Sequence, residues 1–227
     1  ITFLQPCFHF WFIRKSCIKL YMKIIRSVWL IVVFLLCVVS IFADSPITST
    51  PFASAYSDEK IIVAATKARG IITPDLIEYL CKTNHPIELK MALINQLGWQ
   101  NKIKDNGNVF FRALMLKNRY KSEEEFKQKA SGDELLSMAY LKAMDDYQDV
   151  TPALKYADLA LEKNPKSLTY NLILGLIKAQ KAMDGDWCEI FKITDTIRQN
   201  SELTVDIKNE AREIIYEYTD GYKEFCK

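Results

Sequence analysis

The stretch from Ser131 to Pro165 constrains the fold of this chain most. Ser131 and Glu134 have the spacing of a capping box, in which each side chain satisfies a backbone N–H at the start of a helix. Apolar residues recur at helical spacing over 133–147 and again over 152–163, with a short polar turn between the two runs. The stretch therefore predicts two helices packed antiparallel.

A period of about 36 residues extends this pair toward the C-terminus. First helices are expected to begin near Gly132, Leu168 and Thr204, and the intervening helices near Pro152 and Trp187. The same offset places a small residue in each first helix: Ala139, Gly175 and Ala211. A small residue there lets the paired helix cross closely. The spacing predicts one regular helix pair, one degenerate pair and a terminal helix.

These features resemble a tetratricopeptide repeat over residues 131–220. The resemblance rests on the Leu174-Gly175 pair, on Tyr156 between the small residues Ala153 and Ala160, and on Pro165. Lys142 and Lys178, where an aromatic residue is usual, and Glu210, where leucine is usual, depart from the pattern. The resemblance implies an all-α fold of antiparallel helix pairs, stacked as a short right-handed array that binds another protein or a peptide. The chain also resembles exported helical proteins of Bacteroidota-type bacteria.

In such an array, three offsets of the first helices line a concave face that holds a peptide. The residues at these offsets are Leu136, Tyr140, Met144, Leu172, Leu176, Gln180, Lys208, Arg212 and Tyr216. They would form a groove that is apolar at one end and basic at the other. Alternatively, the irregular N-terminal helices fold across this face and bury it, because a short array needs additional core.

The first 43 residues contain no acidic residue and carry five basic ones around two apolar runs. A charged start at Met22, the apolar run over 28–43 and the small residue Ala43 have the layout of a secretory signal peptide. We expect cleavage after Ala43, with residues 1–21 a possible extension of the gene model. An uncleaved membrane anchor is the alternative, and only in that case is a membrane partner expected.

Between this region and the repeat, we expect a flexible linker over 44–57, because this segment is rich in Ser, Thr and Pro. Residues 58–130 are expected to form helices that do not keep the period, and residues 131–227 to form the repeat and a C-terminal helix. Trp99 and Trp187 are expected in the core. Alternating apolar runs typical of strands do not occur, so the predicted class is all-α.

Export would change the charge of the protein. The whole chain carries 30 basic and 28 acidic residues, and loss of residues 1–43 leaves 25 basic against 28 acidic, a net charge of −3. A mildly acidic protein lacks the electrostatic footprint of a nucleic-acid-binding protein, so no nucleic-acid partner is expected.

The sequence offers little for catalysis. Beyond Ala43 it contains one histidine, His85, directly before a proline, where a turn or capping role is expected. Glycine-rich phosphate loops and metal-ligand motifs do not occur in it. Asp145, Asp146 and Asp149 lack the spacing of a calcium loop and are expected to form a solvated turn. We therefore predict no catalytic, cofactor-binding or metal-binding residues and no cofactor.

Three cysteines follow Ala43: Cys81, Cys188 and Cys226. We predict a disulfide between Cys188 and Cys226 if the chain bends back at Asp220-Gly221, since glycine commonly ends helices. The alternative is a buried Cys188 and a free Cys226.

Two classes of function follow. The first is an exported adaptor of the periplasm or cell envelope that binds a protein or peptide. The second is a helical enzyme or carbohydrate-associated factor without a recognisable motif. A structural subunit of a surface assembly is a third, weaker alternative.

Overall fold

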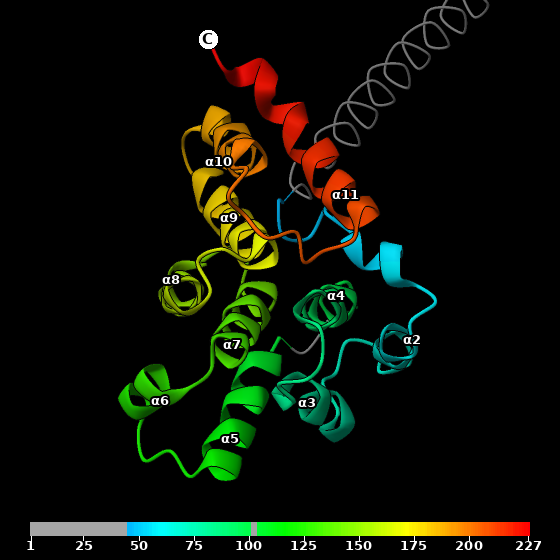
Figure 1. Cartoon of the computed structure of the whole chain (residues 1–227), viewed down its shortest axis with the longest axis vertical. Helices are drawn as coiled ribbons and strands as arrows, with labels where there is room; N and C mark the ends of the chain where they lie inside the picture. Colours follow the sequence, from blue (N-terminus) through cyan, green and yellow to red (C-terminus); the bar gives the residue numbers. More distant parts are fainter. Residues whose placement is uncertain (1–44, 101–103) are drawn as a thin grey trace, which may run out of the picture. The chain divides into compact units, whose positions relative to one another are not determined.

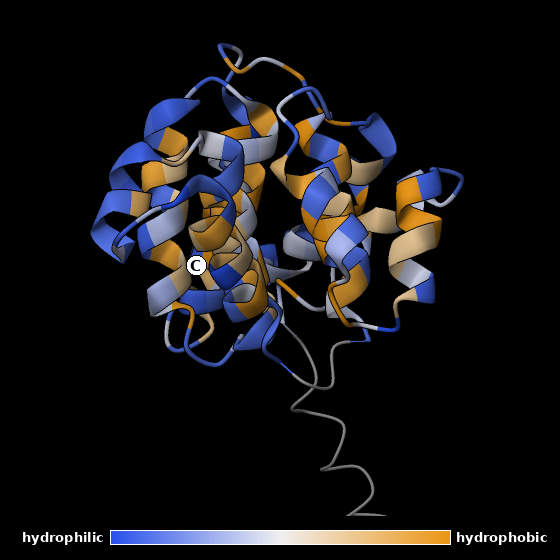
Figure 2. Cartoon of the chain, turned by 90° about the horizontal axis from the view of Figure 1, so that it is seen from below, coloured by the Kyte–Doolittle hydropathy of each residue, from blue (hydrophilic) through white to orange (hydrophobic). Residues whose placement is uncertain are grey.

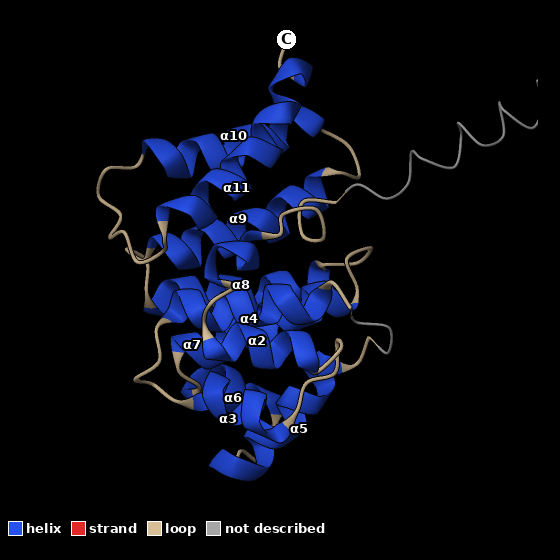
Figure 3. Cartoon of the chain, turned by 90° about the vertical axis from the view of Figure 1, so that its right-hand side faces the viewer, coloured by secondary structure: helices blue, strands red, loops and turns tan. Residues whose placement is uncertain are grey.

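The computed structural model describes residues 45–100 and 104–227, and these residues are all-α, as predicted. The described residues form helices and loops, with a single isolated bridge between Ser167 and Thr204 (Figures 1 and 3). The α-helices are α2 (Lys60–Lys67), α3 (Pro74–Cys81), α4 (Ile87–Gly98), α5 (Asn106–Asn118), α6 (Glu123–Lys129), α7 (Gly132–Asp145), α8 (Thr151–Lys163), α9 (Leu168–Ala182), α10 (Trp187–Gln199) and α11 (Asn209–Asp220). Two 3-10 helices are η2 (Phe52–Tyr56) and η3 (Gly221–Phe225).

The predicted signal region, residues 1–43, lies outside the described residues. Within the described ranges, every helix is too short or too polar to cross a lipid bilayer.

Local capping interactions set the starts of α7, α9 and α10. At α7, the Glu134 N–H donates to Ser131 Oγ over 3.2 Å, and the Ser131 N–H donates to Glu134 Oε2 over 2.9 Å. Ser167 Oγ accepts from the Tyr170 N–H at the start of α9, and Asp186 Oδ1 accepts from the Cys188 N–H at the start of α10. Each cap satisfies a backbone donor that the helix itself leaves unpaired, which explains why these boundaries are readable in the sequence.

Helix α7 lies at the centre of the core, where it packs against α8, α4 and α5. Its buried residues include Leu135, Leu136, Ala139 and Tyr140. Helix α9 packs against α8 and α10, and α10 packs against α11 (Figure 1). The inner sides of the helices are apolar and their outer sides are polar (Figure 2). Burial of these inner sides is the main stabilising contribution.

A buried ion pair joins α4 to α7. Lys90 of α4, with a side chain that is 1% exposed, places Nζ 2.6 Å from Asp133 Oδ2 of α7. The Tyr170 hydroxyl of α9 donates to Asp133 Oδ1 over 2.5 Å. Burial, with a smaller contribution from the Asp133 carboxylate, raises the pKa of Tyr170, so this hydroxyl stays a donor. Asp133 therefore links three helices.

The prediction of a flexible linker over 44–57 is wrong for its described part. Residues 45–56 pack into the core, and Ile47, Phe52 and Tyr56 are all 0% exposed. The small polar residues of this segment are also used: the Thr50 hydroxyl donates to the Pro46 carbonyl over 2.8 Å. The prediction failed because it weighed the Ser, Thr and Pro content of the segment and not its few large apolar residues, which are the ones that pack into the core.

The terminal helix also differs from the prediction, because α11 begins at Asn209 rather than near Thr204. Residues 204–208 belong to the loop between α10 and α11 instead. The Thr204 N–H donates to the Lys166 carbonyl over 2.7 Å, and the Leu168 N–H donates to the Thr204 carbonyl over 3.0 Å. Asp206 then accepts from the Thr169 N–H over 2.8 Å at the start of α9. The connection is thus fixed by backbone pairing and by capping of a neighbouring helix.

Candidate functional site

The structure buries most of the nine residues predicted to line a concave face. Seven of them are at most 9% exposed: Leu136, Tyr140, Met144, Leu172, Leu176, Gln180 and Tyr216. Lys208 and Arg212 are half-buried. Along α7 and α9, other parts of the chain therefore fill the predicted face. This is the alternative in which the N-terminal segments bury the face, and the described residues form no open groove there.

Residues 45–56 and α4 fill the middle of this face. The Phe52 ring stacks on Tyr140 with centroids 6.3 Å apart and an angle of 11° between the ring planes. Asn95 Nδ2 donates to the Tyr140 hydroxyl over 2.9 Å and to the Thr50 carbonyl over 3.0 Å. Asn95 Oδ1 accepts from the Ala53 N–H over 3.0 Å. The buried tyrosine and amide thus satisfy one another, which a buried polar group requires.

Both ends of the face are covered in the same way. Ser45 Oγ donates to Gln180 Oε1. Met144 lies against Gly98 of α4, where an added Cβ would come within 2.3 Å of Met144 Sδ. The Lys208 N–H donates to the Tyr56 hydroxyl over 3.0 Å, and Lys208 Nζ donates to the Ala55 carbonyl over 3.2 Å. Lys208 therefore anchors residues 45–56 rather than facing a ligand.

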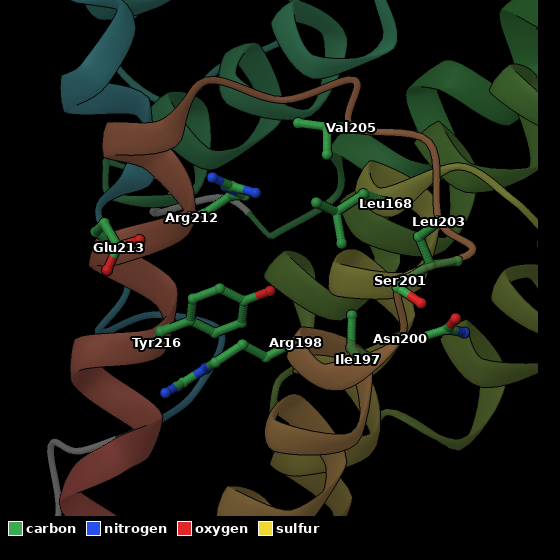
Figure 4. A pocket seen from close by; sticks show the side chains of 10 residues that line it. All are labelled: Leu168, Ile197, Arg198, Asn200, Ser201, Leu203, Val205, Arg212, Glu213 and Tyr216. Atoms are coloured by element: carbon green, nitrogen blue, oxygen red, sulfur yellow. The ribbon is translucent and has the colours of Figure 1, made fainter.

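An open cleft lies beside the filled face, between α10, α11 and the connection between them (Figure 4). Its volume is about 350 Å³, within the range of small-ligand sites. We call it the α10–α11 cleft. Its lining residues are Leu168, Ile197, Arg198, Asn200, Ser201, Leu203, Val205, Arg212, Glu213 and Tyr216.

Two arginines of the cleft have different surroundings. Arg198 forms a two-bond pair with Asp220, with Nη2–Oδ1 2.6 Å and Nη1–Oδ2 3.2 Å, and its guanidinium carbon lies 4.2 Å from the centre of the Tyr216 ring. Arg212 donates through Nη2 to Asn209 Oδ1, and it forms no ion pair with any carboxylate of the described residues. Arg198 is thus neutralised, whereas the positive charge of Arg212 is not.

Tyr216 is placed between these arginines. It is 6% exposed, and its hydroxyl points into the cleft (Figure 4). Burial raises the pKa of this hydroxyl, an effect that Arg198 and Arg212 partly oppose. The group therefore stays protonated at neutral pH and can donate a hydrogen bond to a ligand.

Asp145, the last residue of α7, and Asp146 and Asp149 after it accept hydrogen bonds from backbone N–H groups. Asp145 Oδ2 accepts from the Gly107 N–H over 2.6 Å at the start of α5. Asp146 Oδ1 accepts from the Asp149 N–H over 3.2 Å, and Asp149 Oδ1 accepts from the Thr151 N–H over 3.0 Å. They border a second, smaller cleft of about 220 Å³. Over 45–100 and 104–227, no set of three or more Asp, Glu, His or Cys residues is arranged to hold a metal ion.

The C-terminal end of the chain is tied to α10. Cys188 and Cys226 form a disulfide with their Cα atoms 4.8 Å apart, the pairing that the sequence left as one of two alternatives.

The expectation that Trp99 and Trp187 are core residues is wrong, since they are 48% and 42% exposed. Trp187 instead packs edge-on against Phe225, with centroids 4.9 Å apart.

The predicted period places Arg212 and Tyr216 at ligand-facing positions, and these two residues line an open cleft. The cleft also contains Asn200, Ser201 and Val205 from the loop between α10 and α11, which the period does not predict. Loop residues have no periodicity that could have identified them.

A scan against protein-family models and searches of curated proteins and of solved structures each found no match.

Proposed function

We propose that this protein is an exported helical-repeat protein of the periplasm or cell envelope that binds a protein or peptide partner through the α10–α11 cleft. The observation that carries the proposal is the cleft itself. It combines apolar side chains with hydrogen-bond donors and opens to solvent, whereas the predicted concave face is filled. Ligand sites in proteins commonly combine an apolar lining with a few directed polar groups.

Two features support export. Residues 1–43 have the composition of a secretory signal, and the Cys188–Cys226 disulfide suits an oxidising compartment. In this proposal, helices α7–α11 form a short tetratricopeptide-like array whose concave face is occupied by residues 45–56, so that ligand binding moves to the side of the terminal helix.

The alternative functions have less support. An enzyme of glycosidic bonds needs carboxylates that converge on a pocket. Among the described residues that line the α10–α11 cleft, Glu213 is the only carboxylate, and it projects from the outer side of α11, away from the Tyr216 hydroxyl (Figure 4).

The test is site-specific photocrosslinking in cells that export the protein. A photoreactive amino acid at Val205, which is 62% exposed at the cleft, should capture a discrete partner. The matched control is Leu116, an equally apolar residue that is 82% exposed on α5 and does not line the cleft. Capture of the same proteins from both positions, or of none from Val205, contradicts the proposal.

A further inference from the structure

One polar atom in the wall of the α10–α11 cleft has no partner. Arg212 Nε is buried and makes no hydrogen bond, although it belongs to a charged group. Leaving such a donor unsatisfied is costly, and nearly all buried polar groups in folded proteins are paired. Arg212 also has no neutralising carboxylate among the described residues. Arg212 therefore brings to the cleft a positive charge that no carboxylate of the described residues balances, and its Nε is buried without a partner.

The polar group that faces the cleft beside Arg212 is the Tyr216 hydroxyl. It points into the cleft and stays protonated, so it can donate a hydrogen bond (Figure 4). Asn200 and Ser201 belong to the opposite wall, and their polar ends point away from Arg212 (Figure 4). A cleft that presents a cation and a hydroxyl donor side by side favours an anionic ligand.

Aliphatic side chains form the remainder of the lining. Leu168 and Ile197 lie opposite α11, and Val205 and Leu203 close the end formed by the connection (Figure 4). These aliphatic side chains line the same cleft as Arg212, so a ligand in it can meet both apolar surface and the positive charge. A simple inorganic anion would leave this apolar surface uncovered, whereas a ligand with a branched aliphatic group would cover it.

We propose that the α10–α11 cleft binds a ligand in which a carboxylate stands next to a branched aliphatic group, with Arg212 receiving the carboxylate. This inference rests on the proposed function and specifies its ligand. An arginine fork matches the geometry of a carboxylate and can form two parallel hydrogen bonds to it. The C-terminal residue of a peptide and a free branched-chain acid both have this chemistry, and the volume of about 350 Å³ suits either.

Arg198 acts as a positioning residue in this arrangement. Its pair with Asp220 holds its guanidinium against the Tyr216 ring, which fixes the ring with the hydroxyl directed into the cleft. The charge of Arg198 is already balanced, so it does not compete with Arg212 for the carboxylate.

The test is titration of the ¹⁵N-labelled protein, followed through the Arg212 Nε–H resonance. N-acetyl-L-leucine should shift this resonance, and N-acetyl-L-leucinamide, which lacks the negative charge, should bind at least about tenfold more weakly. N-acetylglycine should also bind more weakly, because it lacks the aliphatic group. Equal binding of the acid and the amide overturns the role of Arg212, and equal binding of the glycine and leucine derivatives overturns the apolar half of the proposal.

Variants provide the matched control. Arg212→Gln should abolish the preference for the acid, whereas Arg112→Gln, which removes an exposed arginine paired with Asp105 on α5, should leave it unchanged. A peptide that ends in leucine should bind more tightly than 4-methylpentanoate if the natural ligand is a peptide C-terminus, and no more tightly if it is a free acid.

The two proposals fail separately. If neither N-acetyl-L-leucine nor its amide shifts the resonance, carboxylate recognition is overturned, while crosslinking from Val205 still decides whether a partner binds. If the acid binds and Val205 captures nothing, the carboxylate site stands and the partner-binding function does not.

Discussion

The first helices α7 and α9 differ from the terminal helix α11 at equivalent positions of the predicted repeat. Tyr140 and Leu176 are completely buried, whereas Arg212 at the same offset lines an open cleft. The difference lies in what covers each helix. Residues 45–56 and α4 cover the face of α7 and α9, and at α11 the same residues reach Lys208 but leave the side toward α10 open.

The predicted repeat register identifies the side chains that share a face, but it does not determine whether that face is open. A register predicts which side chains share a face, because the helical period is local. Whether that face is open depends on chain segments outside the repeat. The following experiments test each half of the contrast.

The largest effect is expected at the filled face. Phe52→Ala removes a ring that is 0% exposed and stacks on Tyr140, so it should lower the free energy of unfolding by about 3–5 kcal/mol. The control, Val205→Ala at the open cleft, should change it by less than about 0.5 kcal/mol because Val205 is 62% exposed. Urea denaturation measures both. A small effect of Phe52→Ala would mean that residues 45–56 are the flexible linker that their composition suggests.

The sequence predicted the regular helices better than the segment that covers them. The starts of α7, α9 and α10 were correctly placed to within a residue, because caps such as Ser131 and Asp186 act on backbone donors two or three residues away. The burial of Phe52 depends on a contact with Tyr140, far away in the sequence, and no local pattern encodes such a contact. The exposed positions of Trp99 and Trp187 were missed for the same reason.

The candidate site was only half predictable. Arg212 and Tyr216 occupy helical positions that the period identifies. Asn200 and Val205 reach the cleft only because Thr204 pairs with residues 166 and 168 and Asp206 caps α9. That arrangement replaces the helix predicted to begin near Thr204, and it is a tertiary effect.

An intermediate effect is expected at the end of the molecule that the disulfide holds. Replacing both Cys188 and Cys226 by alanine should lower the free energy of unfolding by about 2–4 kcal/mol, because the bond closes a loop with a sequence separation of 38 residues. Cys81→Ala, at a half-buried free cysteine, should cost less than about 1 kcal/mol.

The same bond can be checked by counting thiols. Burial raises the pKa of the Cys81 thiol, so the count requires denatured, unreduced protein. Among residues 45–227, one labelled thiol is expected, at Cys81. Labelling at Cys188 and Cys226 as well would show that the C-terminal end is not tied and that the open cleft lacks this support.

The smallest effect is expected where the two regions meet, at Gly175 of α9. A Cβ added there would lie 2.8 Å from Ile197 Cδ1, and Ile197 is also a wall of the α10–α11 cleft. Gly175→Leu should therefore lower the free energy of unfolding by about 1–3 kcal/mol through overpacking. Gly185→Leu is the matched control, because a Cβ there meets nothing within 4 Å and its change should stay within about 0.5 kcal/mol. Adding Ile197→Ala should recover part of the loss in Gly175→Leu, because the added side chain then has space. Equal unfolding midpoints for Gly175→Leu and Gly185→Leu would show that α9 and α10 do not cross closely at Gly175, and the repeat register would then be wrong.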